Sequence, residues 1–595
     1  MEKYYTDEKN AQIVLALLKE HGINQIIASP GTTNIPIVGS VQNDPFFKVY
    51  SSVDERSAAY MACGLARESG RPVVLTCTGA TASRNYLPGL TEAYYSKIPV
   101  IAITSLNDIQ DVGNLKPQNI DRSQLPKDAA KISVNLPVVN SSQDYWFVNH
   151  QVNKAILETY RHGGGPVHIN LNTNYMATFT TKNLPKVNYV ERFFYYTKKL
   201  PSIPSDAKIG IFIGRHKNFS KEEESLIDKF CEQYNGAVFG DRTNGYNGKY
   251  KLNSSLGGVN LTRKHTNFDN YAPSVIIHLG EVTGDYSSMD TFNKSTAPVW
   301  RVSEDGEMRD TFKRLSHIFE MQELDFFDRY IEKDTDRKNI SFFESWKMYL
   351  VSLRTSIPDL PFASSWIAQK TIPQLPKGSF LNLGILNSLR NWNFYPIDPS
   401  IQVESNVGGF GIDGLLSTTL GASLVDENRL YFVVLGDLAF FYDVNSLGNR
   451  HVGKNLRILL INNGTGTEFR NSSHIGSQFG DQSDDYIAAG GHFKPRFKIN
   501  SQDSSLAKSW TSALGFKYYS ACSKEEYLDV LPKFMNSDIT EPILVEVFTN
   551  SEDESNSLEK MVSLDNNYSL KGKIYNFSES ILPMESLKKL RRRFK

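Results

Sequence analysis

Residues 430–466 read LYFVVLGDLAFFYDVNSLGNRHVGKNLRILLINNGTG, and they show the clearest structural pattern of the chain. Two apolar runs, Leu430–Leu435 and Leu456–Ile461, have the length and composition of buried strands. Helical spacing follows the first run over Leu438–Asn449, so the pattern is strand, helix, strand. Strands joined through a helix run parallel, and the helices cover the sheet. The sequence therefore predicts an α/β fold here.

A polar cluster follows each of these two strands directly. Gly436-Asp437 comes after the first strand, and Asn463 follows Asp437 by 26 residues, just after the second. The carboxyl ends of parallel strands meet at one sheet edge, where such sheets bind ligands. A carboxylate, an amide oxygen and a backbone carbonyl, such as that of Thr465, suit Mg²⁺, and a helix start favours phosphate. Either cluster alone is also typical of a helix cap or a turn, but the pair favours a metal–diphosphate site.

Alternating strand and helix patterns extend over most of the chain. Polar, proline-bearing segments at 180–205 and 355–362 interrupt them. We predict an α/β fold with three doubly wound parallel-sheet domains at 1–185, 186–355 and 356–550, followed by a polar tail at 551–595. The other predicted strands are 25–28, 72–77, 99–104, 167–171, 208–213, 237–240, 274–279, 299–302 and 542–548.

Composition narrows the function classes. Lys+Arg and Asp+Glu both total 65, so no global basic field points to nucleic acid. The 4 cysteines form no CxxC pair, which argues against a zinc site or a disulfide framework. The chain shows no apolar signal region and no membrane-length apolar run, so we expect a cytoplasmic protein that acts on small molecules. The basic stretch 588–593 is interpreted as a solvated helix end.

The Gly-Asp and Asn-Asn clusters resemble the diphosphate-binding motif of thiamine diphosphate-dependent enzymes, and the resemblance runs over roughly residues 10 to 550. It implies a pyrimidine-binding, a central and a diphosphate-binding domain, with thiamine diphosphate and Mg²⁺ as cofactors. It also implies a homodimer or homotetramer whose sites lie between subunits. The implied metal ligands are Asp437, Asn463 and Thr465. The implied cofactor contacts also include Gly436, Leu438 and Gly466.

The resemblance also assigns roles to residues outside this motif. Glu55, in the segment SSVDERSAA, matches the glutamate that binds the cofactor's aminopyrimidine at N1′. Gly79 and Ala80 match a small-residue loop against the pyrimidine ring. Ile412 matches the bulky residue that wedges the cofactor in its bent form. Taken alone, Glu55 is also typical of a first-turn glutamate, and Ile412 is equally typical of a core residue.

Within this family, several segments are similar to the menaquinone-pathway 2-succinyl-5-enolpyruvyl-6-hydroxy-3-cyclohexene-1-carboxylate synthases. The segments 53–58, 85–88, 387–389 and 411–418 carry this similarity. It implies that Gln118 is an active-site residue and that Ser388 orients the substrate. Taken alone, Gln118 is also typical of a surface glutamine. Those synthases decarboxylate 2-oxoglutarate and add the product to isochorismate.

Four of the family's carboxylate-binding arginines are replaced or displaced. Thr33, beside Thr32, stands in place of one, Asn107 of another and Val407 of a third. The fourth is shifted, with Arg390 two residues after Ser388. Arginine forks bind carboxylates in bidentate fashion, so we expect Thr32, Thr33, Asn107, Ser388 and Arg390 to form an altered, less cationic substrate site.

The sequence thus predicts an enzyme that decarboxylates a 2-oxo acid and passes the carbanion to an acceptor carbonyl or a proton, with a substrate other than that of the synthases. One alternative is the menaquinone-pathway synthase itself. Another is a non-catalytic scaffold relative, against which the intact Glu55, Asp437 and Asn463 argue. Flavin is not expected, because Ile213-Gly214-Arg215 lacks a GxGxxG pattern.

Overall fold

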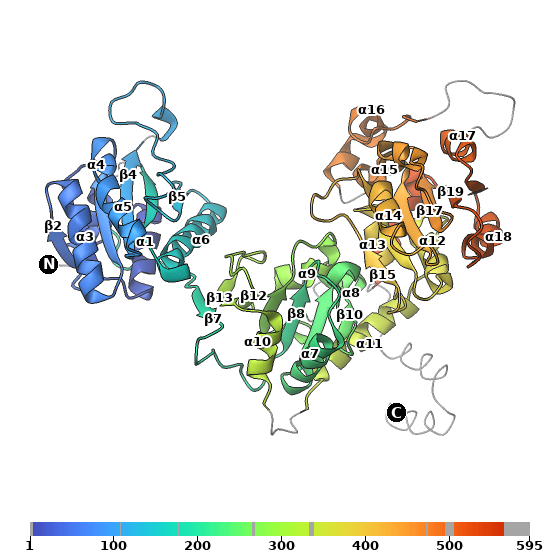
Figure 1. Cartoon of the computed structure of the whole chain (residues 1–595), viewed down its shortest axis with the longest axis horizontal. Coiled ribbons are helices and arrows are strands. Elements are labelled where there is room, and N and C mark those ends of the chain that lie inside the picture. The colour runs from blue at the N-terminus through green and yellow to red at the C-terminus, as the bar shows by residue number, and fades with distance from the viewer. Residues whose placement is uncertain are drawn as a thin grey trace. The chain divides into compact units, whose positions relative to one another are not determined.

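The computed structural model describes residues 4–107, 109–174, 178–263, 268–332, 338–471, 474–493 and 505–564. The chain forms two compact units, residues 1–197 with 305–320, and residues 198–304 with 321–595. Three parallel sheets with flanking helices confirm the predicted α/β class (Figure 1). The domain boundaries remain predictions, and the basic stretch 588–593 lies outside the described residues.

The first unit is built on a six-stranded sheet in the order β2-β1-β3-β4-β6-β5. Its neighbouring strands all pair in parallel. The strands are β1 (Gln25–Ala28), β2 (Lys48–Ser51), β3 (Val73–Thr78), β4 (Val100–Asn107), β5 (Ser133–Leu136) and β6 (Val167–Thr173). The helices are α1 (Lys9–Glu20), α2 (Ile35–Val41), α3 (Glu55–Ser69), α4 (Thr81–Asn85), α5 (Leu87–Tyr95) and α6 (Ser142–Glu158). The short strands β7 (Glu191–Phe194) and β13 (Leu315–Glu320) also pair in parallel within this unit.

Helices cover both faces of this sheet, because alternate strand residues point to opposite faces. Ile26 packs into the cluster formed with α1 and α6, whereas its neighbour Ile27 packs into the cluster formed with α3 and α5. Residues 10–18 of α1 are all buried. The first unit is therefore doubly wound.

The second unit begins with a parallel sheet whose strands run in the order β10-β9-β8-β11-β12. The strands are β8 (Ile209–Ile213), β9 (Gly236–Gly240), β10 (Lys251–Asn253), β11 (Val275–Leu279) and β12 (Val299–Ser303). The helices are α7 (Lys221–Gln233), α8 (Ser255–Arg263), α9 (Tyr286–Lys294), α10 (Glu323–Tyr330) and α11 (Ser341–Thr355). Four of these strands, β8, β9, β11 and β12, are buried along their whole length.

The other sheet of the second unit contains residues 430–466, the segment with the predicted metal–diphosphate site. Its order is β15-β14-β16-β17-β19-β18, and its neighbouring strands all pair in parallel. The strands are β14 (Phe380–Leu383), β15 (Gln402–Glu404), β16 (Tyr431–Gly436), β17 (Leu456–Asn462), β18 (Lys517–Ala521) and β19 (Ile543–Phe548). The helices are α12 (Ser364–Thr371), α13 (Asn387–Asn393), α14 (Leu415–Ser423), α15 (Asp437–Tyr442), α16 (Ser483–Tyr486), α17 (Leu506–Ala513), α18 (Lys524–Phe534) and α19 (Ser551–Val562).

Two elements of this region differ from the sequence patterns. The helix predicted over 438–449 divides into α15 and a 3-10 turn at Val444–Gly448, because the Asp443 carboxylate accepts hydrogen bonds from both the backbone N–H and the hydroxyl of Ser417. The first residues of the polar segment 551–595 form α19. The buried carboxylate of Glu554 ties α19 to α12 by accepting hydrogen bonds from Ser364. No helix in the described residues is long and apolar enough to cross a membrane.

Candidate active site

A cavity of about 230 Å³ lies at the carboxyl ends of β14, β16 and β17. The sheet register places these ends together, since Gly436 of β16 pairs with Ile461 of β17. The cavity brings together predicted site residues that lie far apart in the chain. These are Ser388, Ile412, Gly436, Asp437, Leu438, Asn463, Thr465 and Gly466.

Asp437 is the buried carboxylate of this cavity. It is the first residue of α15, and its two oxygens accept hydrogen bonds from the backbone N–H groups of Leu438 at 3.0 Å and Gly464 at 2.9 Å. Burial raises the pKa of Asp437 to about 6, and these two hydrogen bonds only partly offset it. No basic side chain in the described parts of the chain forms an ion pair with it. A bound cation would therefore stabilise the charged form.

The two asparagines after β17 have different surroundings. Asn462 donates to the Glu546 carboxylate at 2.7 Å, which binds it to the neighbouring strand β19. Asn463 lines the cavity with Asp437. The hydroxyl of Thr465 donates to the Ala488 carbonyl or the Asp484 carboxylate, at 3.1 and 3.0 Å. An Asp carboxylate, an Asn amide oxygen and a backbone carbonyl make a donor set that fits a hard cation such as Mg²⁺.

Two further predicted residues form part of the cavity wall. Ile412 lines the cavity and also packs against the hydrophobic cluster of this sheet, so it has both of the surroundings considered for it. Ser388 lies near the start of α13, is buried, and lines the same cavity. Ser388 therefore shares this cavity with Asp437 and Asn463.

Arg390 lies two residues beyond Ser388 on α13 but is already paired. Its guanidinium contacts both carboxylate oxygens of Glu468, at 2.9 and 2.8 Å, and Asn387 at 3.1 Å. Glu468 lines the cavity, whereas Arg390 is not among the lining residues. In this arrangement, Arg390 neutralises Glu468 and does not offer a free fork to a substrate.

Val407, which replaces one family arginine, is buried and packs closely against Gly284. A Cβ atom added to Gly284 would lie 2.4 Å from Cγ1 of Val407 and 2.8 Å from Cδ2 of Leu389. The loop 282–284 thus makes an apolar contact with Val407. His278 of β11 is also buried, with its ring tilted against Phe212.

Glu55 lies in the first unit and begins α3. Asp54 caps the helix, and its carboxylate accepts the backbone N–H groups of Arg56 and Ser57. Glu55 is partly buried, and Asn85 donates to its carboxylate at 3.3 Å. Glu55 therefore lies at a capped helix N-terminus, and its carboxylate can accept a further hydrogen bond.

The loop after β3 is tightly packed, as its small residues suggested. A Cβ atom on Gly79 would lie 3.3 Å from both the Ser105 carbonyl oxygen and Cζ of Arg122. Ala80 has a φ of 57°, a conformation unfavourable for residues with a side chain. Such local strain is typical of functional loops. Thr33 is buried at the same place, 2.5 Å from the Thr78 hydroxyl, and donates to the Ser105 carbonyl at 2.8 Å.

Arg122 is a residue that the motifs did not reveal. It is buried, and none of its three side-chain nitrogens has a hydrogen-bond partner among the described residues. Burial lowers the pKa of Arg122 to about 10. A buried guanidinium without a partner is costly, which points to an anionic ligand. In the sequence, Arg122 is distinguished only by its position four residues after Gln118, and it belongs to no recognisable motif.

The remaining predicted residues of the first unit are more exposed. Gln118 lies on an exposed loop with a φ of 69°. Thr32 is exposed and Asn107 is partly buried at the end of β4. The two groups of candidate residues thus lie in different units, with Glu55 and Gly79 in the first and Asp437 in the second.

Comparisons with known proteins identify the class to which the chain belongs. Residues 8–125 match the family model of the thiamine pyrophosphate enzyme, N-terminal TPP binding domain. The class defined by the sheets and this match is that of thiamine diphosphate enzymes.

Full-length relatives define the family more narrowly. A protein of Phocaeicola vulgatus is 30% identical over 574 residues, covering 93% of this chain and 98% of its own. Proteins of Bacteroides fragilis and Bacteroides thetaiotaomicron are each 30% identical, with the same shares covered. All three are named 2-succinyl-5-enolpyruvyl-6-hydroxy-3-cyclohexene-1-carboxylate synthase. The chain belongs to the family of thiamine diphosphate-dependent enzymes that includes these synthases.

Proposed function

We propose that this chain is a 2-succinyl-5-enolpyruvyl-6-hydroxy-3-cyclohexene-1-carboxylate synthase. In this reaction 2-oxoglutarate loses its C1 carboxylate as CO₂, and the remaining four-carbon unit forms a C–C bond with isochorismate, with uptake of one proton. The names and full-length coverage of the relatives support this activity. The observation that carries the proposal is the cavity that joins Asp437, Asn463 and Thr465 to Ser388.

The residues of the cavity suit the two cofactors of this chemistry. Asp437, Asn463 and the Thr465 carbonyl would hold Mg²⁺, and the start of α15 would receive the diphosphate. When bound, thiamine diphosphate supplies the carbon nucleophile and accepts the electron pair released on decarboxylation. Glu55 would hold a proton at the aminopyrimidine N1′, and Ile412 would support the bent cofactor. Gln118 and Ser388 would orient the substrate.

Arg122 offers a partial replacement for the missing arginines. It is buried beside Gly79 and Ser105, the loop at which Thr33 replaces one family arginine. Its unpartnered nitrogens could bind a substrate carboxylate in bidentate fashion. Arg122→Gln should therefore raise the KM of the dicarboxylic donor by about tenfold or more. Arg71→Gln, at an exposed arginine of the same unit, is the matched control.

Exposed apolar side chains near Glu55 support a homodimer or homotetramer. Val53 is 80% exposed, and Tyr60 and Met61 on α3 are 49% and 45% exposed. Apolar groups gathered in this way are typical of an interface. Light scattering coupled to size-exclusion chromatography should give at least twice the chain mass of 67.1 kDa. A monomer at micromolar concentration would contradict the shared site.

A second candidate is a related transfer with a less anionic substrate. The pairing of Arg390 with Glu468 and the apolar site of Val407 favour it, because both reduce the positive charge offered to a polyanion. The relatives favour the first proposal. A non-catalytic scaffold is the least supported, because the cavity keeps Asp437 and Asn463 together.

Release of CO₂ distinguishes these functions. The chain, loaded with thiamine diphosphate and Mg²⁺, should be given 2-oxoglutarate with and without isochorismate, and separately pyruvate and phenylpyruvate. The synthase predicts CO₂ release from 2-oxoglutarate together with a ligated product when isochorismate is present. Turnover only of the monocarboxylic acids would support the second candidate, and no turnover by cofactor-loaded protein would overturn both.

A further inference from the structure

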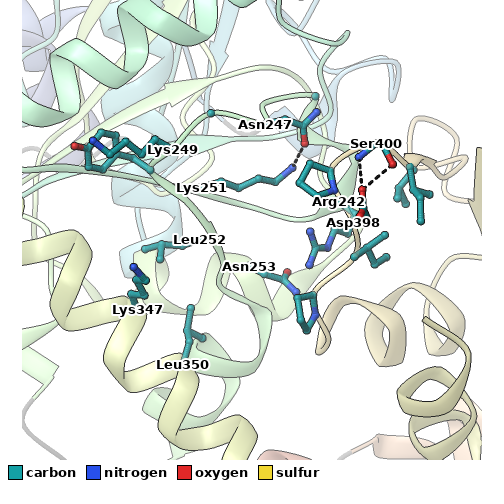
Figure 2. Close-up of a pocket in the computed structure, with 18 of the residues that line it drawn as sticks. Arg242, Asn247, Lys249, Lys251, Leu252, Asn253, Lys347, Leu350, Asp398 and Ser400 are labelled. Atoms are coloured by element: carbon teal, nitrogen blue, oxygen red, sulfur yellow. Dashed lines mark hydrogen bonds between the residues drawn. The ribbon is translucent and has the colours of Figure 1, made fainter. Parts of the chain in front are cut away.

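A second cavity of the second unit shares no lining residue with the cofactor cavity. It measures about 610 Å³ (Figure 2). Its walls are the segment 242–253, which ends in β10, the helix α11, and the segment 396–403 that leads into β15. This volume is within the range of small-molecule sites.

The cavity is strongly cationic although the whole chain has no net charge. Only two carboxylates line it, Glu344 and Asp398, which leaves a formal charge of +4. The six cationic side chains are Arg242, Lys249, Lys251, Lys347, Arg354 and Arg429. A concave surface of one sign concentrates ligands of the other sign.

Both carboxylates already have partners. Asp398 accepts the backbone N–H and the hydroxyl of Ser400, at 2.9 and 2.7 Å (Figure 2). Glu344 lies 3.7 Å from Lys347 on the next turn of α11. Neither carboxylate neutralises the cations deeper in the walls.

Three of those cations contact only neutral acceptors in the described part of the chain. Arg242 donates to the Tyr395 carbonyl at 2.9 Å, Lys251 to the Asn247 side chain at 3.0 Å, and Arg354 to the Asn253 carbonyl. Nε of Arg242 and Nε of Arg354 are buried without a hydrogen-bond partner.

Burial and mutual repulsion make this arrangement unfavourable when the cavity is empty. Desolvation, and then repulsion from Arg354, lower the pKa of Arg242 to about 9. Desolvation, and then repulsion from Arg242, lower the pKa of Lys251 to about 7. Desolvation also lowers the pKa of Arg354 to about 10. An anion between these groups would remove the repulsion and supply the missing acceptors.

We propose that this cavity binds a small organic anion with two or more carboxylate or phosphate groups. Guanidinium forks suit both oxyanions, and cations on three separate wall segments require charge at more than one end of the ligand. Leu252 and Leu350, which also line the cavity, would contact its carbon skeleton (Figure 2).

Calorimetric titration of the full chain tests the site. The probes are citrate, which carries carboxylates, and fructose 1,6-bisphosphate, which carries phosphates. We expect submillimolar binding of at least one probe, and the preferred probe identifies the oxyanion. Arg354→Gln and the charge reversal Lys347→Glu should each weaken binding by about tenfold or more, and Lys347 is exposed, so its variant should fold.

The matched control is Lys229→Gln, at an exposed lysine of α7 that does not line the cavity, and it should bind within about twofold of wild type. Asp437→Ala should also keep the binding, because Asp437 belongs to the other cavity. Binding of neither probe, or binding that both Arg354→Gln and Lys347→Glu leave unchanged, would overturn the proposal.

Discussion

The Arg390 guanidinium and the Glu468 carboxylate form a bidentate ion pair, with Nη1 to Oε2 at 2.9 Å and Nη2 to Oε1 at 2.8 Å. Both side chains are about four-fifths buried. Glu468 lines the same cavity as Asp437, so under the proposed function the pair would control how much positive charge Arg390 presents to a substrate. A substrate carboxylate must compete with Glu468 for the same two N–H donors.

Glu468→Gln tests this competition. Loss of the carboxylate should free the Arg390 fork, so the KM of a dicarboxylic 2-oxo acid should fall several-fold, by up to about tenfold. The variant should also lose about 1–3 kcal/mol of unfolding free energy, because a charged hydrogen-bonded pair is broken. Steady-state kinetics and urea unfolding measure the two effects. Glu552→Gln, at an exposed glutamate of α19, is the control, and an unchanged KM in Glu468→Gln would refute the role of the pair.

Glu55→Gln tests the proton-holding role of the glutamate at the start of α3. The amide keeps the size of the side chain but cannot exchange a proton, so kcat should fall by about 10² to 10⁴ while the cofactor still binds. The measurement is kcat beside the affinity for thiamine diphosphate. Glu68→Gln, exposed near the end of the same helix, should keep wild-type kcat. Wild-type turnover in Glu55→Gln would remove this residue from the mechanism.

Two glycines of the first unit should respond oppositely to alanine. A Cβ atom on Gly31 would lie 2.6 Å from Cβ of Thr78, so Gly31→Ala should cost about 1–3 kcal/mol of unfolding free energy. Gly64 lies within α3 with no atom within 4 Å of its added Cβ, so Gly64→Ala should gain about 0.5–1 kcal/mol. Urea unfolding gives both values. An equal change in unfolding free energy in the two variants would contradict the close contact between Gly31 and Thr78.

The pH dependence of anion binding should follow Lys251. Its pKa is about 7 in the empty cavity; Arg242 lowers it further after burial, while Asp241 and Glu224 raise it. A bound anion raises this pKa, so binding takes up a proton above pH 7, and affinity should fall as pH rises from 7 to 9. Citrate titrations at pH 7, 8 and 9 measure the slope. Lys251→Gln should flatten it, and an equal slope in that variant would exclude Lys251 as its source.

Central strands that are continuous apolar runs could be predicted, whereas β14, an interior strand whose run is broken by Asn382, was missed. The run predicted at 25–28 is β1, and those at 430–435 and 456–461 shift by at most one residue in β16 and β17. The edge strand β18 was missed, because only Ala521 among its residues is fully buried and the apolar signal is correspondingly weak.

The candidate site was predictable where it follows strand ends and unpredictable where it depends on distant partners. Asp437 and Asn463 share a cavity because their strands are neighbours. The partner of Arg390 lies 78 residues further along the chain, so the sequence alone presented this arginine as a free cation. Arg122 was missed for the same reason, since only the fold reveals that it is buried without a partner.

The most direct test of the account is calorimetric titration of the metal-free apo protein with thiamine diphosphate, with and without Mg²⁺, beside Asp437→Ala and the exposed control Asp529→Ala. The account predicts metal-dependent binding at micromolar or lower concentration in the wild type and Asp529→Ala, and its loss in folded Asp437→Ala. Unchanged, metal-dependent binding in Asp437→Ala, or no binding by folded wild type, would contradict it.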